Sequence, residues 1–252
     1  MENLILTSIE NGVATLCLNR PDKLNALSRA MIYALAAAFE KVEEDKSVQA
    51  IVITGSGEKA FVAGADIAEF LSISKDEVLG LCAYVHDLFA QIENCTKPVI
   101  ACINGFALGG GLELAMACHI RLASENAVLG LPETSLGIIP GYGGTQRLPA
   151  IVGKAKALEM ILSAGKVNAL EAKNMGLVSY VLPLADLHQK ALALAQNMLK
   201  TDALARSEAI QAVNAHFDKH INGFQREIAL FGECFGSDGF TQRVTAFLHK
   251  EK

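Results

Sequence analysis

Two glutamates, each beside a glycine-rich segment, are the residues of this sequence best suited to acid–base chemistry. Glu113 ends the segment Gly-Gly-Gly-Leu-Glu at residues 109–113, and Glu133 lies eight positions before Gly141. A carboxylate set among apolar and small residues is costly unless it has a partner or a chemical role. Two such carboxylates close together can hold a water molecule and divide the roles of acid and base. We therefore expect this pair to define what the protein does.

The three consecutive glycines at 109–111 are expected where a loop enters a helix. Backbone N–H groups at such a point face outward at the positive end of the helix dipole, which suits an anion or an oxyanion. The segment lacks the Gly-Lys-Ser/Thr of a phosphate loop and the Gly-x-Gly-x-x-Gly spacing of a dinucleotide site. An alternative explanation is a close crossing of two backbone segments, which also requires glycine.

A second loop, residues 60–67, consists largely of small residues that let a ligand approach the backbone. One N–H from this loop and one from the glycine segment can form an oxyanion hole, which stabilises negative charge on a carbonyl oxygen. The alternative is an ordinary strand-to-helix loop in which Asp66 caps the next helix. Glu133 likewise has an alternative role as a first-turn helix acid, because it follows a proline. A third loop at 141–144 offers a further N–H for bound water, and Arg147 beyond it is expected to be structural.

Composition argues against several classes of protein. The 252 residues are 51% hydrophobic and 19% charged, which is enough for a large core. The net charge is −5 and basic residues are not clustered, which argues against a nucleic-acid partner. The six cysteines form no C-x-x-C pair and are expected to be buried reduced thiols. No targeting segment or membrane-spanning run is evident, so we expect a cytoplasmic protein with no membrane partner, although a matrix protein without its leader would look the same.

An α/β fold is expected to position these loops. Residues 3–9 and 12–18 predict a hairpin, and the apolar runs 48–54 and 97–103 indicate buried strands of a parallel sheet. Functional loops in such sheets follow the carboxyl ends of strands. We place a soft boundary near residue 200, between an α/β core at 1–200 and a helical C-terminal region at 201–252. Further strands are expected at 120–123 and 178–182, and helices at 29–45, 75–95, from 111, 143–150, 153–164, 168–175, 185–200, 202–217, 221–235 and 238–249.

Several short motifs in a fixed order resemble the enoyl-CoA hydratase/isomerase (crotonase) superfamily, and most closely its short-chain enoyl-CoA hydratases. They lie at residues 19–27, 63–67, 109–113, 132–133, 139–141, 143–148 and 246–248. The resemblance implies a spiral of ββα units with a helical C-terminal region that builds a homotrimer or a homohexamer of two trimers. It also implies an acyl-CoA substrate, with no metal and no cofactor beyond the coenzyme A of the substrate.

The resemblance assigns roles to individual residues. The backbone N–H groups of Ala65 and Gly110 would form the oxyanion hole, and Gly141 would help to position the water. Glu113 would take a proton from that water and Glu133 would protonate Cα. Contacts to coenzyme A would come from Lys23, Leu24, Ala26, Ala63, Ala65, Asp66 and Ile67, and a C-terminal lysine, Lys250 or Lys252, would reach a phosphate in a neighbouring subunit.

The chain departs from the family pattern at two positions. Ala68 stands where many hydratases have a lysine, which removes one cation on the phosphate side. His119 stands where an aspartate is common and is expected to be structural. Cys82 and His86 have helical spacing for half a metal site, but no further ligands cluster near them. An acyl pocket is expected near Phe70, Leu71, Leu81 and Tyr84.

The resemblance predicts hydration of trans-2-enoyl-CoA to 3-hydroxyacyl-CoA, in fatty-acid β-oxidation or in short-chain acyl-CoA metabolism. The alternative on the same scaffold is a Δ3,Δ2-enoyl-CoA isomerase, which needs one base and no bound water. The presence of both glutamates favours hydration. A non-catalytic RNA-binding role is a second alternative, and the acidic net charge argues against it.

Overall fold

The computed structural model describes residues 3–250, apart from the side chain of Lys250. Its larger sheet has six strands in the order β1-β2-β3-β5-β7-β10. The hairpin of β1 and β2 is antiparallel, and each remaining pair of neighbours is parallel. Asn11 and Gly12 have φ of 49° and 79°, as a two-residue hairpin turn requires. The predicted hairpin and parallel sheet are thus confirmed. The strands are Ile5–Glu10, Val13–Leu18, Ala50–Gly55, Val99–Ile103, Ile120–Ser124 and Tyr180–Leu182.

A smaller sheet has four strands in the order β4-β6-β8-β9. They are Ala60–Val62, Phe106–Leu108, Val128–Gly130 and Lys166–Asn168. The first three are parallel to one another, and β9 runs antiparallel to β8. Each of the first three follows a strand of the larger sheet along the chain, and β4 and β6 are then followed by helices. The succession agrees with the spiral of ββα units that the resemblance implied.

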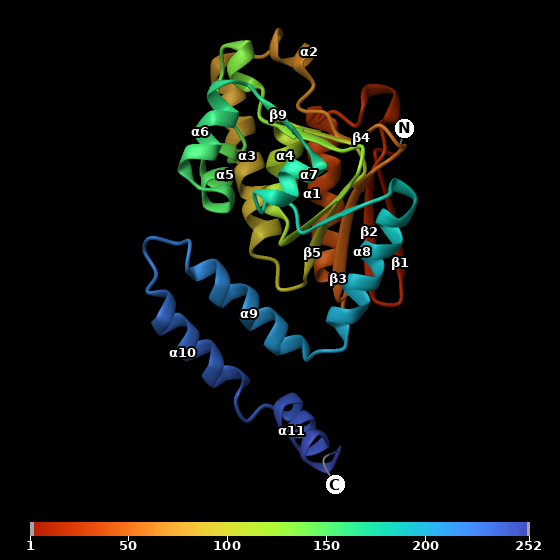
Figure 1. The fold of residues 1–252 in the computed structure, drawn as a ribbon, viewed down its shortest axis with the longest axis vertical. Helices are drawn as coiled ribbons and strands as arrows, with labels where there is room; N and C mark the ends of the chain where they lie inside the picture. The colour runs from red at the N-terminus through yellow and green to blue at the C-terminus, as the bar shows by residue number, and fades with distance from the viewer. Residues whose placement is uncertain (1–2, 251–252) are drawn as a thin grey trace.

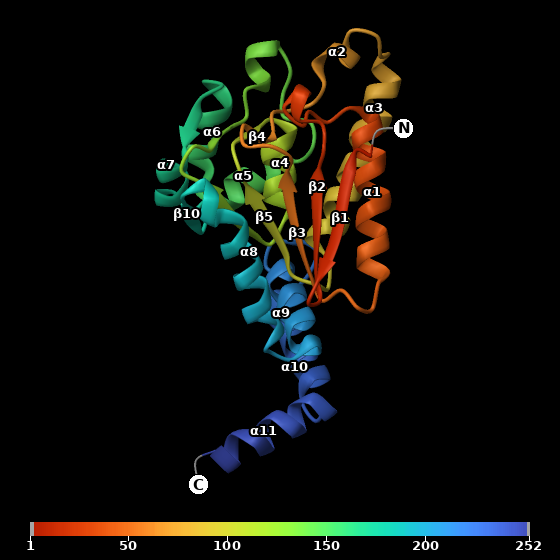
Figure 2. The same cartoon turned by 90° about the vertical axis from the view of Figure 1, so that its right-hand side faces the viewer.

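Helices cover both faces of the larger sheet (Figure 2). Helix α1 begins after Ser28, whose hydroxyl accepts a hydrogen bond from the N–H of Met31, and α3 begins with a capping box formed by Ser74 and Glu77. Helix α8 covers the opposite face with Leu187, Ala191 and Ala195. The helices of this part are Arg29–Glu44 (α1), Ile67–Phe70 (α2), Lys75–Glu93 (α3), Gly110–Ala117 (α4), Gly144–Val152 (α5), Lys154–Leu162 (α6), Ala169–Asn174 (α7) and Leu184–Leu199 (α8), with 3-10 turns at Pro21–Lys23 and Glu133–Leu136.

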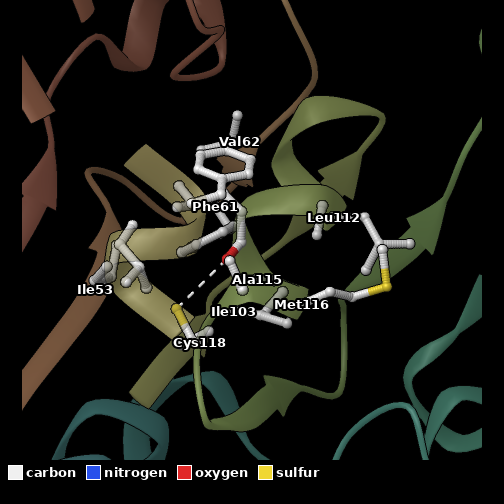
Figure 3. Close-up of a cluster of buried hydrophobic side chains, with 14 of the residues drawn as sticks. Ile53, Phe61, Val62, Ile103, Leu112, Ala115, Met116 and Cys118 are labelled. Atoms are coloured by element: carbon white, nitrogen blue, oxygen red, sulfur yellow. Dashed lines mark hydrogen bonds between the residues drawn. The ribbon is translucent and has the colours of Figure 1, made fainter. Parts of the chain in front are cut away.

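Helix α4 is embedded in the core, and all eight of its residues are buried. Leu112, Ala115 and Met116 of α4 lie among Phe61 and Ile103 from neighbouring strands (Figure 3). The Sγ of Cys118 contacts the carbonyl oxygen of Leu114 at 3.5 Å, which the dashed line in Figure 3 marks. A helix in this position places any polar side chain that it carries in surroundings of low polarity.

Three further helices extend away from the sheets: α9 (Ala203–Ala215), α10 (Gly223–Cys234) and α11 (Asp238–Lys250) (Figure 1). Helices α9 and α10 pack against each other, and α11 lies farthest from the core (Figures 1 and 2). Large apolar side chains on and between these helices are exposed, namely Val213, Phe217, Ile221, Phe224, Ile228, Phe231, Phe235, Phe247 and Leu248. The region therefore presents apolar surface that its own chain does not cover.

Candidate active site

Glycines allow the start of α4 to lie directly against the loop after β4. A Cβ on Gly111 would overlap the carbonyl oxygen of Val62, and one on Gly64 would lie 3.5 Å from the carbonyl oxygen of Leu108. A Cβ on Gly109 would lie 2.5 Å from Oε1 of Glu133. Close backbone crossing thus explains Gly111, whereas Gly109 makes room for an acidic side chain. Both explanations offered for this glycine segment therefore hold, each for a different glycine.

A cavity of about 1110 Å³ lies where these segments meet. It brings together Glu113, Glu133, Ala65, Gly110 and Gly141, as the sequence predicted. A separate hollow of about 460 Å³ is lined by Pro21, Asp22, Leu24, Asn25 and residues 56–60 and does not include the two glutamates. The chemistry that two carboxyls can perform therefore belongs to the larger cavity, whose size suits an extended ligand.

The predicted oxyanion donors, Ala65 and Gly110, are held between hydrogen-bonded neighbours. Around Ala65, the N–H of Leu27 donates to the carbonyl oxygen of Gly64 at 2.8 Å, and the N–H of Asp66 donates to that of Leu27 at 3.0 Å. Before Gly110, the N–H of Gly109 donates to Gly130 at 2.9 Å. Within residues 3–250 the N–H groups of Ala65 and Gly110 have no acceptor of their own. Both residues can therefore donate to a ligand atom in the cavity that they share.

Glu113 is almost fully buried, with 1% of its surface exposed. Its Oε1 accepts hydrogen bonds from the backbone N–H of Tyr142 at 2.8 Å and of Gly144 at 2.7 Å. Burial raises the pKa of Glu113 to about 7, and the charge of Glu133 adds to this rise, while the two N–H donors and Arg147 oppose it. A carboxyl with a pKa near neutrality is suited to general base catalysis.

Glu133 opens the 3-10 turn that ends at Leu136. Its Oε2 is buried and has no hydrogen-bond partner among the residues that the structure describes. Burial raises the pKa of this carboxyl as well. Because the charge of Glu133 also raises the pKa of Glu113, the two groups form a coupled pair. An unpartnered carboxyl oxygen beside a second carboxyl can accept a water or deliver a proton to a ligand.

The turn after Gly141 supplies donors that the sequence did not reveal. Gly141 lines the cavity, but the N–H groups that hold Glu113 belong to Tyr142 and Gly144. The ring of Tyr142 packs edge-on against Phe89, with 6.3 Å between the ring centroids. The glycine at position 144 was the one hint of these donors in the sequence. In the structure a Cβ there would lie 2.9 Å from Oε1 of Glu113, which explains why the residue is glycine.

The predicted contacts for coenzyme A divide between the two hollows. Ala63, Ala65 and Ile67 line the cavity and Leu24 lines the smaller hollow, whereas Lys23, Ala26 and Asp66 line neither. Asp66 takes the N-cap position of α2, as the alternative expected, but its side chain makes no capping hydrogen bond. Its Oδ2 instead accepts a hydrogen bond from Arg20 at 2.8 Å. Lys252 and the side chain of Lys250 lie outside the described part of the chain.

Of the four residues expected near an acyl pocket, Phe70 lines the cavity and the other three do not. Leu71 is 93% exposed, Leu81 belongs to the core, and Tyr84 packs edge-on against Tyr33. The face of α3 that borders the cavity instead carries Val78, Leu79, Cys82 and His86. Val78, Cys82 and His86 follow at intervals of four residues and Leu79 lies three before Cys82, so the four share one helix face. Leu81 and Tyr84 are absent from the lining of the cavity. Leu136, Ile138 and Ile139 add further apolar residues to the lining of the cavity.

His119 has the surroundings of a structural residue. Nδ1 of His119 accepts a hydrogen bond from the N–H of Val99 at 2.9 Å, and its Nε2 lies 3.0 Å from the carbonyl oxygen of Glu93. Both ring nitrogens therefore contact backbone, as expected of a structural histidine. Cys82 and His86 line the cavity, and no third metal-ligating side chain joins them among the residues described.

Comparisons with known proteins show a likeness in sequence and fold along nearly the whole chain. Residues 8–252 match the family model described as enoyl-CoA hydratase/isomerase. The chain is 42% identical to a crotonyl-CoA hydratase of Syntrophomonas wolfei, over 100% of this chain and 96% of the relative. It is 40% identical to a short-chain-enoyl-CoA hydratase of Clostridium acetobutylicum, over 100% and 97% of the two chains. The crystal structure of an enoyl-CoA hydratase from Bacillus anthracis superposes with a TM-score of 0.93 at 36% identity, covering 98% of this chain and 96% of that one.

Proposed function

Because the chain belongs to the enoyl-CoA hydratase/isomerase family, we propose that it is a lyase that hydrates trans-2-enoyl-CoA to 3-hydroxyacyl-CoA. The observation that supports hydration most directly is the presence of buried Glu113 and half-buried Glu133 in one cavity. Addition of water requires one group to remove a proton from the water and another to deliver a proton to carbon. Two coupled carboxyls meet both requirements.

In this mechanism the thioester oxygen lies between the N–H groups of Ala65 and Gly110. These donors stabilise the negative charge that develops on that oxygen when water attacks the double bond. Glu113 takes a proton from the water, whose oxygen forms a bond to C3 of the acyl group. Electrons of the double bond move toward the thioester, and Glu133 then delivers its proton to C2. The sum is one water added across C2 and C3.

Hydrogen bonding supports this division of roles. Glu113 accepts two backbone N–H donors, and such donors stabilise the ionised form of a carboxyl. Oε2 of Glu133 has no donor within residues 3–250, and its own backbone N–H is what opposes the effect of burial on its pKa. In the free protein burial raises the pKa of Glu113 further, to about 7, so this proposal requires the acyl group, once it displaces water from the cavity, to shift the shared proton onto Glu133. This leaves Glu113 ionised, as a base must be.

The alternative is a Δ3,Δ2-enoyl-CoA isomerase on the same scaffold. An isomerase moves one proton between two carbons and needs neither a bound water nor a second carboxyl. The coupled pair of Glu113 and Glu133 favours hydration. Incubation with crotonyl-CoA separates the two functions. A hydratase bleaches the absorbance of the conjugated thioester and adds the mass of water, whereas an isomerase with no hydratase activity leaves crotonyl-CoA unhydrated but converts a 3-enoyl-CoA.

The cavity also supports a preference for acyl-CoA substrates of modest length. Apolar side chains of α3 and of residues 136–139 face it, and the two hydratases compared above act on crotonyl-CoA or short-chain enoyl-CoA by name. We place the reaction in short-chain acyl-CoA metabolism or fatty-acid β-oxidation. Water and two carboxyls suffice for the chemistry, so we propose no cofactor beyond the coenzyme A of the substrate. Activity after exhaustive dialysis against a chelator would agree with this.

We further propose that residues 201–252 form an assembly region on an α/β core at 1–200. The exposed phenylalanines Phe224, Phe231, Phe235 and Phe247 would be covered by other copies in a homotrimer or a homohexamer. Light scattering coupled to size exclusion measures the mass directly. Replacing Phe231 by Asp should shift that mass toward a monomer, and a monomeric wild-type protein would contradict the proposal.

All six cysteines are free thiols, and burial raises the pKa of Cys95, Cys102 and Cys118 to about 12. Unreactive thiols of this kind fit a reducing compartment such as the cytoplasm, where we place the protein. The net charge of −5 argues against a nucleic-acid partner. Among residues 3–250 the structure has no helix with both the length and the apolar character needed to cross a bilayer.

A further inference from the structure

Arg147 of α5 joins two elements behind the wall of the cavity. Its Nη2 and Nε donate to Oε2 of Glu93 on α3, at 2.8 and 3.2 Å, and its Nη1 donates to the carbonyl oxygen of Tyr142 at 3.3 Å. The side chain of Arg147 is 13% exposed. Arg147 and Glu93 are absent from the lining of the cavity, whereas Tyr142 belongs to it. The guanidinium therefore acts on the wall of the site and not on a ligand.

The turn that Arg147 holds is the one that holds Glu113. The N–H groups on either side of Gly143, those of Tyr142 and Gly144, both donate to Oε1 of Glu113. Gly143 has φ of 104°, a conformation that favours glycine. A Cβ at residue 143 would overlap Nη1 of Arg147. The turn is thus folded closely around the guanidinium, with one carbonyl facing Arg147 and two N–H groups facing the carboxyl.

Glu93, the partner of Arg147, is itself fixed near the end of α3. Its carbonyl oxygen accepts a hydrogen bond from Nδ2 of Asn214 at 2.7 Å and lies 3.0 Å from Nε2 of His119. A guanidinium binds two acceptors in a fixed plane, which the compact ammonium of lysine does not reproduce. The orientation of Arg147 is therefore determined by α3 on one side and by the turn on the other.

On the basis of the proposed function, we propose that Arg147, oriented by Glu93, is a positioning residue for hydration that keeps the turn at 142–144 aimed at the carboxyl of Glu113. Its positive charge acts in the same direction as the two N–H donors, because all of them favour the ionised base. Loss of Arg147 removes the charge and loosens the donors together. Both changes make Glu113 a weaker base at neutral pH without touching the ligand.

The test compares Arg147→Gln and Arg147→Lys with Lys156→Gln, which removes a cation from the ion pair with Glu159 on α6. Rates of crotonyl-CoA hydration are measured across pH. Arg147→Gln should lower kcat about 10- to 100-fold with KM changed less than about threefold, since a small misplacement of catalytic groups is that costly. The acidic limb of its kcat/KM profile should move to higher pH. Arg147→Lys should lower kcat by a smaller factor and move the limb less, and Lys156→Gln should match the wild type.

A readout without substrate separates this proposal from the proposed function. The carboxyl carbons of 13C-labelled glutamate are titrated by NMR, and the signal of Glu113 is identified by its loss in Glu113→Gln. Arg147→Gln should move the titration of Glu113 to higher pH whether or not the wild type hydrates crotonyl-CoA. A wild type without hydratase activity would contradict the proposed function and leave the positioning role of Arg147 intact. A folded Arg147→Gln protein with wild-type kcat and an unmoved titration would overturn the positioning role. If Arg147→Gln does not fold, Arg147→Lys provides the test. A wild-type kcat in Arg147→Lys would contradict the need for a guanidinium that binds two acceptors at once.

Discussion

The backbone nitrogen of Gly144 lies 2.7 Å from Oε1 of Glu113, and a Cβ on Gly144 would lie 2.9 Å from that same oxygen. The residue that donates the hydrogen bond is thus also one whose lack of a side chain admits the carboxyl. Neither role is visible from residue 113 or residue 144 alone, because they are distant in the sequence. Gly144 of the third loop therefore helps to position the carboxyl of Glu113.

Gly144→Ala should displace the carboxyl of Glu113. The added methyl would lie 2.9 Å from Oε1 of Glu113 and from Cδ1 of Leu131 and 3.0 Å from Cβ of Pro140, so the side chains around it, the carboxyl among them, must shift. We expect kcat for crotonyl-CoA to fall at least about tenfold, in line with the cost of small misplacements of catalytic groups. The matched control is Gly80→Ala, since Gly80 is exposed on α3 and a Cβ there meets nothing within 4 Å. That variant should keep full activity and gain up to about 1 kcal/mol of stability.

Glu113→Gln and Glu133→Gln should each lower kcat at least about a hundredfold, the usual scale of general acid–base steps. In Glu113→Gln the amide oxygen of the new side chain can still accept the two N–H donors, so the site should keep its shape. Calorimetric titration with a 3-hydroxyacyl-CoA should therefore give nearly unchanged affinity. Substantial turnover by either variant would contradict the roles assigned to the pair.

The raised pKa of Glu113 predicts how the activity of the wild type depends on pH. The pKa of Glu113 is raised to about 7, and a base must be ionised to act. The kcat/KM of the wild type should therefore fall as the pH drops through about 7. An acidic limb near the ordinary glutamate pKa of about 4.3 would show that Glu113 is not the group that titrates.

Stability should depend on pH in the opposite sense. The folded pKa of Glu113 is raised above its unfolded value of about 4.3, so between that value and about 7 the folded protein binds more protons than the unfolded one. The contribution of Glu113 to stability is therefore full below the unfolded pKa and is lost as the pH rises through the folded pKa. Urea unfolding should show the stability of Glu113→Gln, relative to the wild type, increasing from about pH 4 to about pH 8. A constant difference would refute this linkage.

The oxyanion hole is tested by a pair of substitutions at Gly110. Proline fits the first position of a helix but removes the N–H, and it should lower kcat about 100- to 1000-fold. Alanine keeps the N–H and brings a similar methyl group, which would lie 3.1 Å from the ring of Tyr142 and 3.3 Å from Leu27. The ratio of the two variants isolates the donor from the crowding. Equal activities of Gly110→Pro and Gly110→Ala would remove Gly110 from the oxyanion hole.

Local sequence patterns were enough to predict the long elements. Ser28 and the apolar face of Met31, Leu35, Phe39 and Val42 predict α1 because capping and helical spacing act within the helix itself. The strands of the smaller sheet were missed, since three residues such as Ala60–Val62 are too few to show an alternating pattern. Their pairing with Phe106–Leu108 and Val128–Gly130 depends on contacts far along the chain.

The site was predicted to the extent that its motifs are contiguous. Glu113, Glu133, Ala65 and Gly110 meet in one cavity, as expected from loops at the ends of parallel strands. The N–H groups of Tyr142 and Gly144 were not predicted, because which backbone group faces a distant carboxyl depends on the fold of the turn and not on residue type. The side of α3 that lines the cavity was misplaced for a similar reason, since an amphipathic helix with two neighbours has two apolar sides.

The central claim is best tested by converting crotonyl-CoA in D2O and locating the isotope in the product by NMR. Hydration by the paired carboxyls predicts 3-hydroxybutyryl-CoA with one carbon-bound deuterium at C2, formed by the wild type and suppressed in Glu133→Gln. Recovery of crotonyl-CoA without any 3-hydroxy product, from a folded wild-type protein, would contradict the account.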